Sequence, residues 1–270
     1  MKKGNGLQTL LILFFVALIG FSGWKLYGIY AEYHKGTEAY GELVDQYVSM
    51  ETTAEKQNAG APDGVETPRL QETEAAVEEM ISVDVAALKE TYPDVVGWIY
   101  CPGTVVNYPI VKGKDNDYYL HRLMDGEYSL GGTLFMDYRN TGDFSDWNSI
   151  IYGHNMKNGS MLAVLTEYYE QEFYEKHPVW YLFTEECDYQ IELVGGYTTP
   201  ADSDTYSFPE SAEAKNALVK KADRSSTFES GITVGEDERL VTFSTCVYDY
   251  ENARYVLVGV LREHEKLTEE

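Results

Sequence analysis

Positive charge is scarce in this sequence. It holds 21 Lys and Arg against 45 Asp and Glu, which gives a net charge of −24 at pH 7. Nucleic-acid backbones need cationic partners, so this balance argues against a nucleic-acid partner. Metal-ligand clusters, phosphate-binding loops and dinucleotide fingerprints are also absent from the sequence, so we expect no metal and no cofactor.

Long apolar runs are absent except near the N-terminus. There, Leu7–Trp24 is long enough for a marginal bilayer span and follows Lys2 and Lys3. A cleaved signal peptide is the alternative, because Gly20 and Ser22 are small, but the run contains no clear A-x-A site. We therefore expect an uncleaved single-pass anchor in the cell membrane. The positive-inside rule predicts a cytoplasmic N-terminus and an extracellular acidic remainder.

Cysteine is scarce too. The three cysteines, Cys101, Cys187 and Cys246, cannot all pair, and their spacing fits no zinc motif. A bridge between Cys101 and Cys187 is disfavoured, because each lies in an apolar, strand-like stretch that is typical of a core. An unpaired cysteine in an exported protein needs a chemical reason to exist.

The composition divides the chain into four parts. Residues 1–30 form the cytoplasmic start and anchor, 31–80 an acidic stalk with N-terminal helices, 81–265 the main domain, and 266–270 a tail. Within the stalk, Glu51–Arg69 has almost no large apolar residue, which indicates a flexible segment.

The stalk is expected to matter little for folding. Because residues 31–69 offer little apolar surface, a chain that begins near Leu70 should fold and remain active. A helical pattern runs from Leu70 toward Lys89, with Ser82 or Asp84 as a cap of its last segment.

Beyond Pro93 the pattern changes to short β-like runs separated by turns. Eight such runs predict a mainly β fold with helical inserts, either a closed barrel or a sandwich. Apolar residues four apart predict a helix over Met161–Glu175, and a capping box at Ser207–Glu210 predicts another through Lys221. The predicted strands are Val95–Cys101, Thr104–Val111, Thr133–Asp137, Asn148–Tyr152, Val179–Thr184, Tyr189–Tyr197, Arg239–Thr245 and Arg254–Leu261.

The last two strands carry a candidate chemical pair. Cys246 closes one strand, a polar loop follows, and Arg254 opens the next strand. If the strands form a hairpin, the two residues face each other across roughly 5 Å between Cα atoms. A neighbouring guanidinium favours the nucleophilic thiolate and can stabilise an oxyanion.

A proton donor is the missing part, and histidine is the usual one near neutral pH. His154 is the favoured candidate, because it follows an apolar strand and sites are often found at the ends of rigid strands. The other histidines are less suitable: His34 lies in the stalk, His121 in a turn, His177 in a linker and His264 in the tail. Taken singly, Cys246, His154 and Arg254 each have an ordinary structural explanation.

Several segments, in the right order, resemble the sortase family. Thr242-Phe-Ser-Thr-Cys246 resembles the T-L-x-T-C strand, and Arg254 stands where the family arginine does. The likeness covers roughly Val83–Leu261. The remaining similar segments are Asn148–Met156 around the histidine and, as in class B members, Asn107–Val111, Asp115–Leu120, Phe135–Asn140 and a helical insert between Tyr197 and Thr233.

The resemblance implies an eight-stranded sortase barrel in a Gram-positive-type envelope. It implies a Cys246 thiolate that attacks a C-terminal sorting signal of N-P-x-T-x type on surface proteins. His154 would protonate the leaving amine and Arg254 would hold the oxyanion or substrate carbonyls. Ser244, Thr245 and Asn155 would contact substrate, and the Ser207–Lys221 helix would border the substrate groove.

The amine that accepts the acyl group is left open by the sequence. A peptidoglycan precursor is one source, and a pilin lysine, as in a pilin-polymerising sortase, is another. A cysteine endopeptidase of the cell envelope is a more distant alternative, disfavoured because such enzymes place the cysteine before the histidine and at a helix start. A non-catalytic surface-binding module, with Cys246 buried and inert, is a third.

Overall fold

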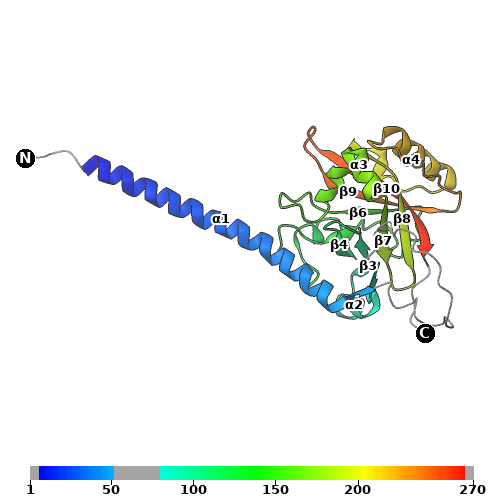
Figure 1. Cartoon of the computed structure of the whole chain (residues 1–270), viewed down its shortest axis with the longest axis horizontal. Helices are drawn as coiled ribbons and strands as arrows, with labels where there is room; N and C mark the ends of the chain where they lie inside the picture. The colour runs from blue at the N-terminus through cyan, green and yellow to red at the C-terminus, as the bar shows by residue number, and fades with distance from the viewer. Residues whose placement is uncertain (1–5, 52–79, 265–270) are drawn as a thin grey trace, which may run out of the picture.

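The computed structural model describes residues 6–51 and 80–264, in which a long helix leads into a closed β-barrel (Figure 1). Most of the predicted flexible segment, the start of the predicted helix at Leu70, and the tail at residues 266–270 lie outside the described residues.

Helix α1 spans Gly6–Tyr47, 42 residues. Its large apolar side chains between Leu10 and Tyr30 are exposed, and this part of the helix projects away from the barrel (Figure 1). It is the one helix among the described residues that is long and apolar enough to cross a membrane. Because no protein covers this apolar surface, α1 is a candidate membrane span.

The other end of α1 belongs to the core. Tyr40, Leu43 and Tyr47 lie three and four residues apart, so they share one helical face, and each is buried against the barrel domain. The expectation that residues 31–69 contribute little apolar surface is therefore wrong for these three residues. The sequence misled because charged side chains on the opposite face dominate the composition of this stretch.

A small sheet and a short helix connect α1 to the barrel. Strand β1 (Val48–Glu51) pairs antiparallel with β2 (Met80–Val83), so the helical pattern predicted from Leu70 is wrong at β2. Helix α2 covers Val85–Thr91, and the Asp84 side chain accepts a hydrogen bond from the Ala87 amide at 2.9 Å. The predicted cap at Asp84 is confirmed.

All eight predicted strands exist and close into a barrel in the order β10-β8-β7-β3-β4-β5-β6-β9. Pairing is antiparallel except between β4 and β5 and between β6 and β9, which run parallel. Of the two predicted architectures, the barrel is confirmed. The strands are β3 (Val95–Tyr100), β4 (Asn107–Lys112), β5 (Leu134–Met136), β6 (Asn148–Tyr152), β7 (Val179–Phe183), β8 (Asp188–Pro200), β9 (Arg239–Cys246) and β10 (Ala253–His264).

The helix predicted over Met161–Glu175 is two shorter helices. A 3-10 helix, η2, covers Ala163–Tyr169, and α3 covers Gln171–Lys176 after an extended Glu170 with φ −104° and ψ 126°. Residues four apart do not share a face in a 3-10 helix, because it has three residues per turn. The apolar spacing therefore did not describe one continuous stripe.

The insert between β8 and β9 contains a helix, as predicted, but it begins later. Helix α4 spans Ala212–Ser225, and its cap is Ser211, whose Oγ accepts from the Ala214 amide at 3.2 Å. The predicted cap, Ser207, instead ends the 3-10 helix η3 (Asp204–Tyr206). Pro209 disfavours helical backbone at Phe208, the residue before it, which works against a helix that begins directly after Ser207.

Candidate active site

Strands β9 and β10 bring Cys246 and Arg254 together. The two residues are direct partners in the antiparallel register, as their spacing predicted. The connecting loop is closed by the Val247 amide, which donates to the Ala253 carbonyl at 3.1 Å. Both Cys246 and Arg254 are half-buried, so the thiol and the guanidinium lie at one rim of the barrel and remain accessible.

The parallel pairing of β6 with β9 brings His154 to the same rim. Tyr152 is the register partner of Ser244, and His154 follows Tyr152 by two residues, as Cys246 follows Ser244. Two bonds extend the ladder beyond β6: the Gly153 amide donates to the Ser244 carbonyl at 3.1 Å, and Thr245 Oγ1 donates to the Gly153 carbonyl at 2.8 Å.

Asn155 ties the two strand ends together. Its Nδ2 donates to the Cys246 carbonyl at 2.9 Å, a contact between residues 91 positions apart in the chain. The predicted site residues thus come together: His154 and Asn155 follow β6, while Ser244, Thr245 and Cys246 end β9, beside Arg254 at the start of β10.

The His154 ring is held from the opposite side by the segment at η1 (Tyr119–His121). His154 Nε2 lies 2.9 Å from the Leu120 carbonyl oxygen. A carbonyl can only accept, so Nε2 carries a hydrogen and Nδ1 is the nitrogen that gains or loses a proton. The His121 ring, predicted as a surface turn residue, stacks on His154 with 5.1 Å between centroids and 22° between planes.

The electrostatics of His154 disfavour its charged form. Burial lowers the pKa of His154 below its ordinary value, the hydrogen bond to Leu120 opposes this, and the charge of His121 lowers it further. The imidazolium is therefore the minor form at neutral pH.

Tyr206, from the insert, is a site residue that the sequence reading missed. Its hydroxyl shares a 2.8 Å hydrogen bond with Ser244 Oγ, and its ring stacks on Tyr152 at 6.1 Å. Burial raises the pKa of Tyr206 to about 12; the charge of Arg254 lowers it and that of Cys246 raises it, so both groups lie near the phenol. No periodicity or motif pointed to Tyr206, because it reaches the rim from a 3-10 turn.

The three thiols are free and differ in surroundings. Cys101 is fully buried after β3, and burial raises the pKa of its thiol to about 11. Cys187 lies in the turn between β7 and β8, not within a strand as expected. Cys246 is the thiol that shares a rim with an imidazole and a guanidinium. Among the described residues no group of three or more metal-ligating side chains gathers.

Comparison with known proteins identifies the family. No family model matches the chain. Sortase B of Listeria monocytogenes is 33% identical over 265 residues, which cover 97% of this chain and 99% of the relative. The solved structure of Bacillus anthracis sortase B matches with a TM-score of 0.68 at 30% identity and covers 87% of this chain and 100% of that one.

A second solved structure, the Staphylococcus aureus sortase B–substrate complex, matches with a TM-score of 0.63 and 31% identity over 66% of this chain and 84% of that one. The chain therefore belongs to the class B sortases. It is an enzyme of the sortase family, whose activity is transpeptidation.

Proposed function

We propose that Cys246 is the nucleophile of a thioacyl-forming transpeptidase. The Cys246 thiolate attacks the carbonyl carbon of the peptide bond that follows the threonine of a sorting signal. A thioester forms as the C–N bond of that peptide bond breaks. His154, as imidazolium, gives the departing amine its proton from Nδ1, while Arg254 donates hydrogen bonds to the oxyanion. The convergence of these three side chains at one barrel rim carries the proposal.

The second half of the reaction regenerates the enzyme. An incoming amine attacks the thioester, a new amide forms, and the thiol of Cys246 leaves. We infer that the substrate is a surface protein with an N-P-x-T-x sorting signal and that the amine comes from a peptidoglycan precursor. The enzyme then attaches surface proteins to the cell wall by joining the two. The substrate-bound Staphylococcus aureus relative supports a sorting-signal substrate in general.

Ser244, Thr245 and Asn155 are proposed to shape the substrate site. Thr245 and Asn155 already use a side-chain atom to hold Gly153 and the Cys246 carbonyl, so they contribute by fixing the strand ends. Ser244 forms a hydroxyl pair with Tyr206. We infer that this pair meets the substrate where the insert borders the groove.

The site is proposed to work outside the cell. Residues 1–30 act as a retained anchor with a cytoplasmic N-terminus, supported by Lys2 and Lys3 and by the exposed apolar surface of α1. Along the chain, the anchor is followed by the stalk over residues 31–80, the catalytic domain over residues 81–265 and the tail at residues 266–270.

Mass spectrometry of the full chain with a sorting-signal peptide tests this function. The expected adduct is the acyl part of the signal on Cys246, which disappears when triglycine is added and reappears as a peptide joined to triglycine. An adduct on Cys101 or Cys187, or turnover by Cys246→Ala, would overturn the proposed site.

The acceptor amine separates the alternatives in the same assay. A pilin-polymerising sortase would prefer a peptide with a lysine side chain over triglycine. A cysteine endopeptidase would release the free acid at the same yield whether or not either amine is present.

A further inference from the structure

The C-terminal part of α1 contacts one particular segment of the barrel domain, residues 119–133. The Tyr40 hydroxyl donates to the Gly132 carbonyl and lies 3.1 Å from Thr133 Oγ1. Lys35 forms an exposed ion pair with Glu127 at 2.5 Å. Tyr40 is only 7% exposed, so its hydroxyl contacts are shielded from water.

The same segment holds the His154 ring. The Thr133 amide donates to the Tyr119 carbonyl at 3.0 Å, and its Oγ1 donates to the Arg122 carbonyl at 2.9 Å. Between Tyr119 and Arg122 lies Leu120, whose carbonyl meets His154 Nε2. Thr133 therefore holds both sides of the turn that carries the histidine contact.

The two backbone segments of this turn approach each other closely at Gly132. Gly132 has φ +54°, and a Cβ placed there would lie 2.3 Å from the carbonyl oxygens of both Tyr119 and Leu120. Only glycine fits at this position, so the backbone at Gly132 packs directly against the backbone of Tyr119 and Leu120. The position of the Leu120 carbonyl thus follows the position of Gly132 and Thr133.

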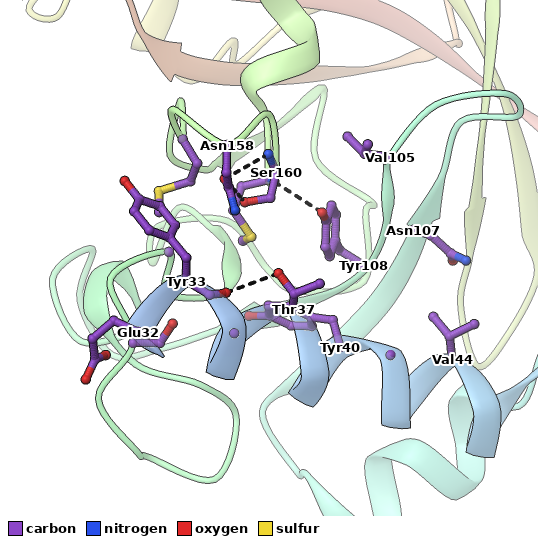
Figure 2. A pocket seen from close by; sticks show the side chains of 16 residues that line it. Glu32, Tyr33, Thr37, Tyr40, Val44, Val105, Asn107, Tyr108, Asn158 and Ser160 are labelled. Atoms are coloured by element: carbon purple, nitrogen blue, oxygen red, sulfur yellow. Dashed lines mark hydrogen bonds between the residues drawn. The ribbon is translucent and has the colours of Figure 1, made fainter. Parts of the chain in front are cut away.

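The loop that follows His154 faces α1 across a hollow. A cavity of about 390 Å³ separates α1 from that loop, with Tyr33 and Tyr40 on one wall and Asn158 and Ser160 on the other (Figure 2). The Tyr40 ring contacts Tyr108, with 5.2 Å between centroids, but the partners of the Tyr40 hydroxyl are Gly132 and Thr133, so its hydrogen bonds lead to the Thr133–Leu120 turn.

We propose that Tyr40 is a positioning residue for His154, so that the candidate membrane helix sets the geometry of the proton donor. This inference rests on the proposed role of His154. The hydroxyl of Tyr40 fixes Thr133, Thr133 fixes the turn, and the turn holds the Leu120 carbonyl against Nε2. His121 is the titratable side chain that faces His154 from η1, while Cys246 and Arg254 lie at the neighbouring strand ends.

Tyr40→Phe in the full chain, held in lipid nanodiscs, tests the inference. The Leu120 carbonyl supports the charged ring, so loosening it lowers the pKa of His154. We expect a fall of about half a pH unit, a roughly threefold loss of imidazolium at neutral pH. NMR titration of the His154 ring measures it, and kcat for the sorting-signal peptide should fall by the same factor with KM unchanged.

Tyr47→Phe is the matched control. Tyr47 is buried on the same face of α1, but its hydroxyl contacts Thr91 Oγ1 at 3.2 Å, on the α2 side. A role limited to docking α1 would affect both variants alike, whereas positioning affects Tyr40→Phe alone. An equal pKa of His154 in both variants would overturn the inference.

A second pair of variants tests the next link in the chain of contacts. Thr133→Val removes the hydroxyl between Tyr40 and Arg122, and Thr133→Ser keeps it. We expect the lowered pKa of His154 in the valine variant and recovery in the serine variant; no difference between them would count against the inference. The NMR titration requires no turnover, so it remains decisive even if the wild-type chain forms no thioester and the proposed function fails.

Discussion

The two sides of the active site are built in different ways. On one side, Cys246 and Arg254 are partners in a single hairpin, eight residues apart in the chain. On the other, His154 depends on the Leu120 carbonyl, 34 residues away, and on Tyr40, which contacts Gly132 across 92 residues. The thiol side is thus local in sequence, and the imidazole side is assembled from distant segments.

This difference predicts where the site is rigid. The thiol and guanidinium are fixed by the ladder of β9 and β10, whose inner residues are buried. The His154 imidazole is held by the 3-10 turn η1, by the exposed His121 and, through that turn, by helix α1, which leads away from the barrel. Substitutions at the hairpin should abolish transpeptidation, while substitutions around His154 should change its rate.

The largest effect is expected at the thiol. Cys246→Ala should form no thioacyl enzyme, because neither of the other two cysteines, Cys101 and Cys187, shares the rim with Arg254. Cys101→Ala is the control: its thiol is buried and its pKa is raised to about 11, so activity should persist. Intact-mass analysis after incubation with peptide measures both, and an acyl adduct on the Cys246→Ala chain would contradict the prediction.

Arg254→Lys should come next, with a fall in kcat/KM on the order of 100-fold, because an ammonium cannot reproduce a planar fork of donors at an oxyanion. Arg262→Lys is the matched control on the same strand. Arg262 pairs with Glu192 at 2.6 Å and Glu238 at 3.1 Å, and both pairs lie at the other end of β10. Equal losses in the two variants would indicate a structural cause.

Deleting residues 1–69 should weaken the imidazole side without touching the hairpin. The deletion removes Tyr40, Leu43 and Tyr47 from the core together with β1, and we expect the free energy of unfolding to fall by at least about 3 kcal/mol. A chain that begins at Ala31 should keep nearly full stability. Denaturant titration compares the two, and equal midpoints would restore the view of residues 31–69 as a dispensable stalk.

The smallest effect is expected from His121→Gln. A positive charge at His121 lowers the pKa of His154, so removing it should raise that pKa slightly. The imidazolium population then increases at a given pH. His177→Gln is the control, since His177 Nδ1 contacts the Pro102 carbonyl away from the rim. NMR titration of His154 measures the change, and a lower pKa would show that stacking outweighs charge.

The sequence predicted what local pattern determines. Alternating apolar runs gave all eight strands, and the spacing of Cys246 and Arg254 gave their pairing, because a hairpin register depends on its own loop. Of the five histidines, His154 is favoured by its place after an apolar strand, and the parallel pairing of β6 with β9 brings it to the same rim as Cys246.

What the sequence did not predict depends on distant contacts. Tyr206, His121 and Tyr40 carry no motif, and each matters only because another segment lies against it. The burial of Tyr40 was hidden by the acidic composition around it. The roles of Ser244, Thr245 and Asn155 toward substrate stay predictions.

Because β6 and β9 pair in a parallel ladder, the alignment of His154 with Cys246 can change only by whole residues of register. Strands exchange hydrogen-bond partners only residue by residue, and a slip by one turns Cys246 to the opposite face of the sheet. A slip by two restores the face but displaces the thiol by about 7 Å. No intermediate register exists, so the register of this one ladder decides whether the thiol and the imidazole lie side by side or are separated by at least one whole step.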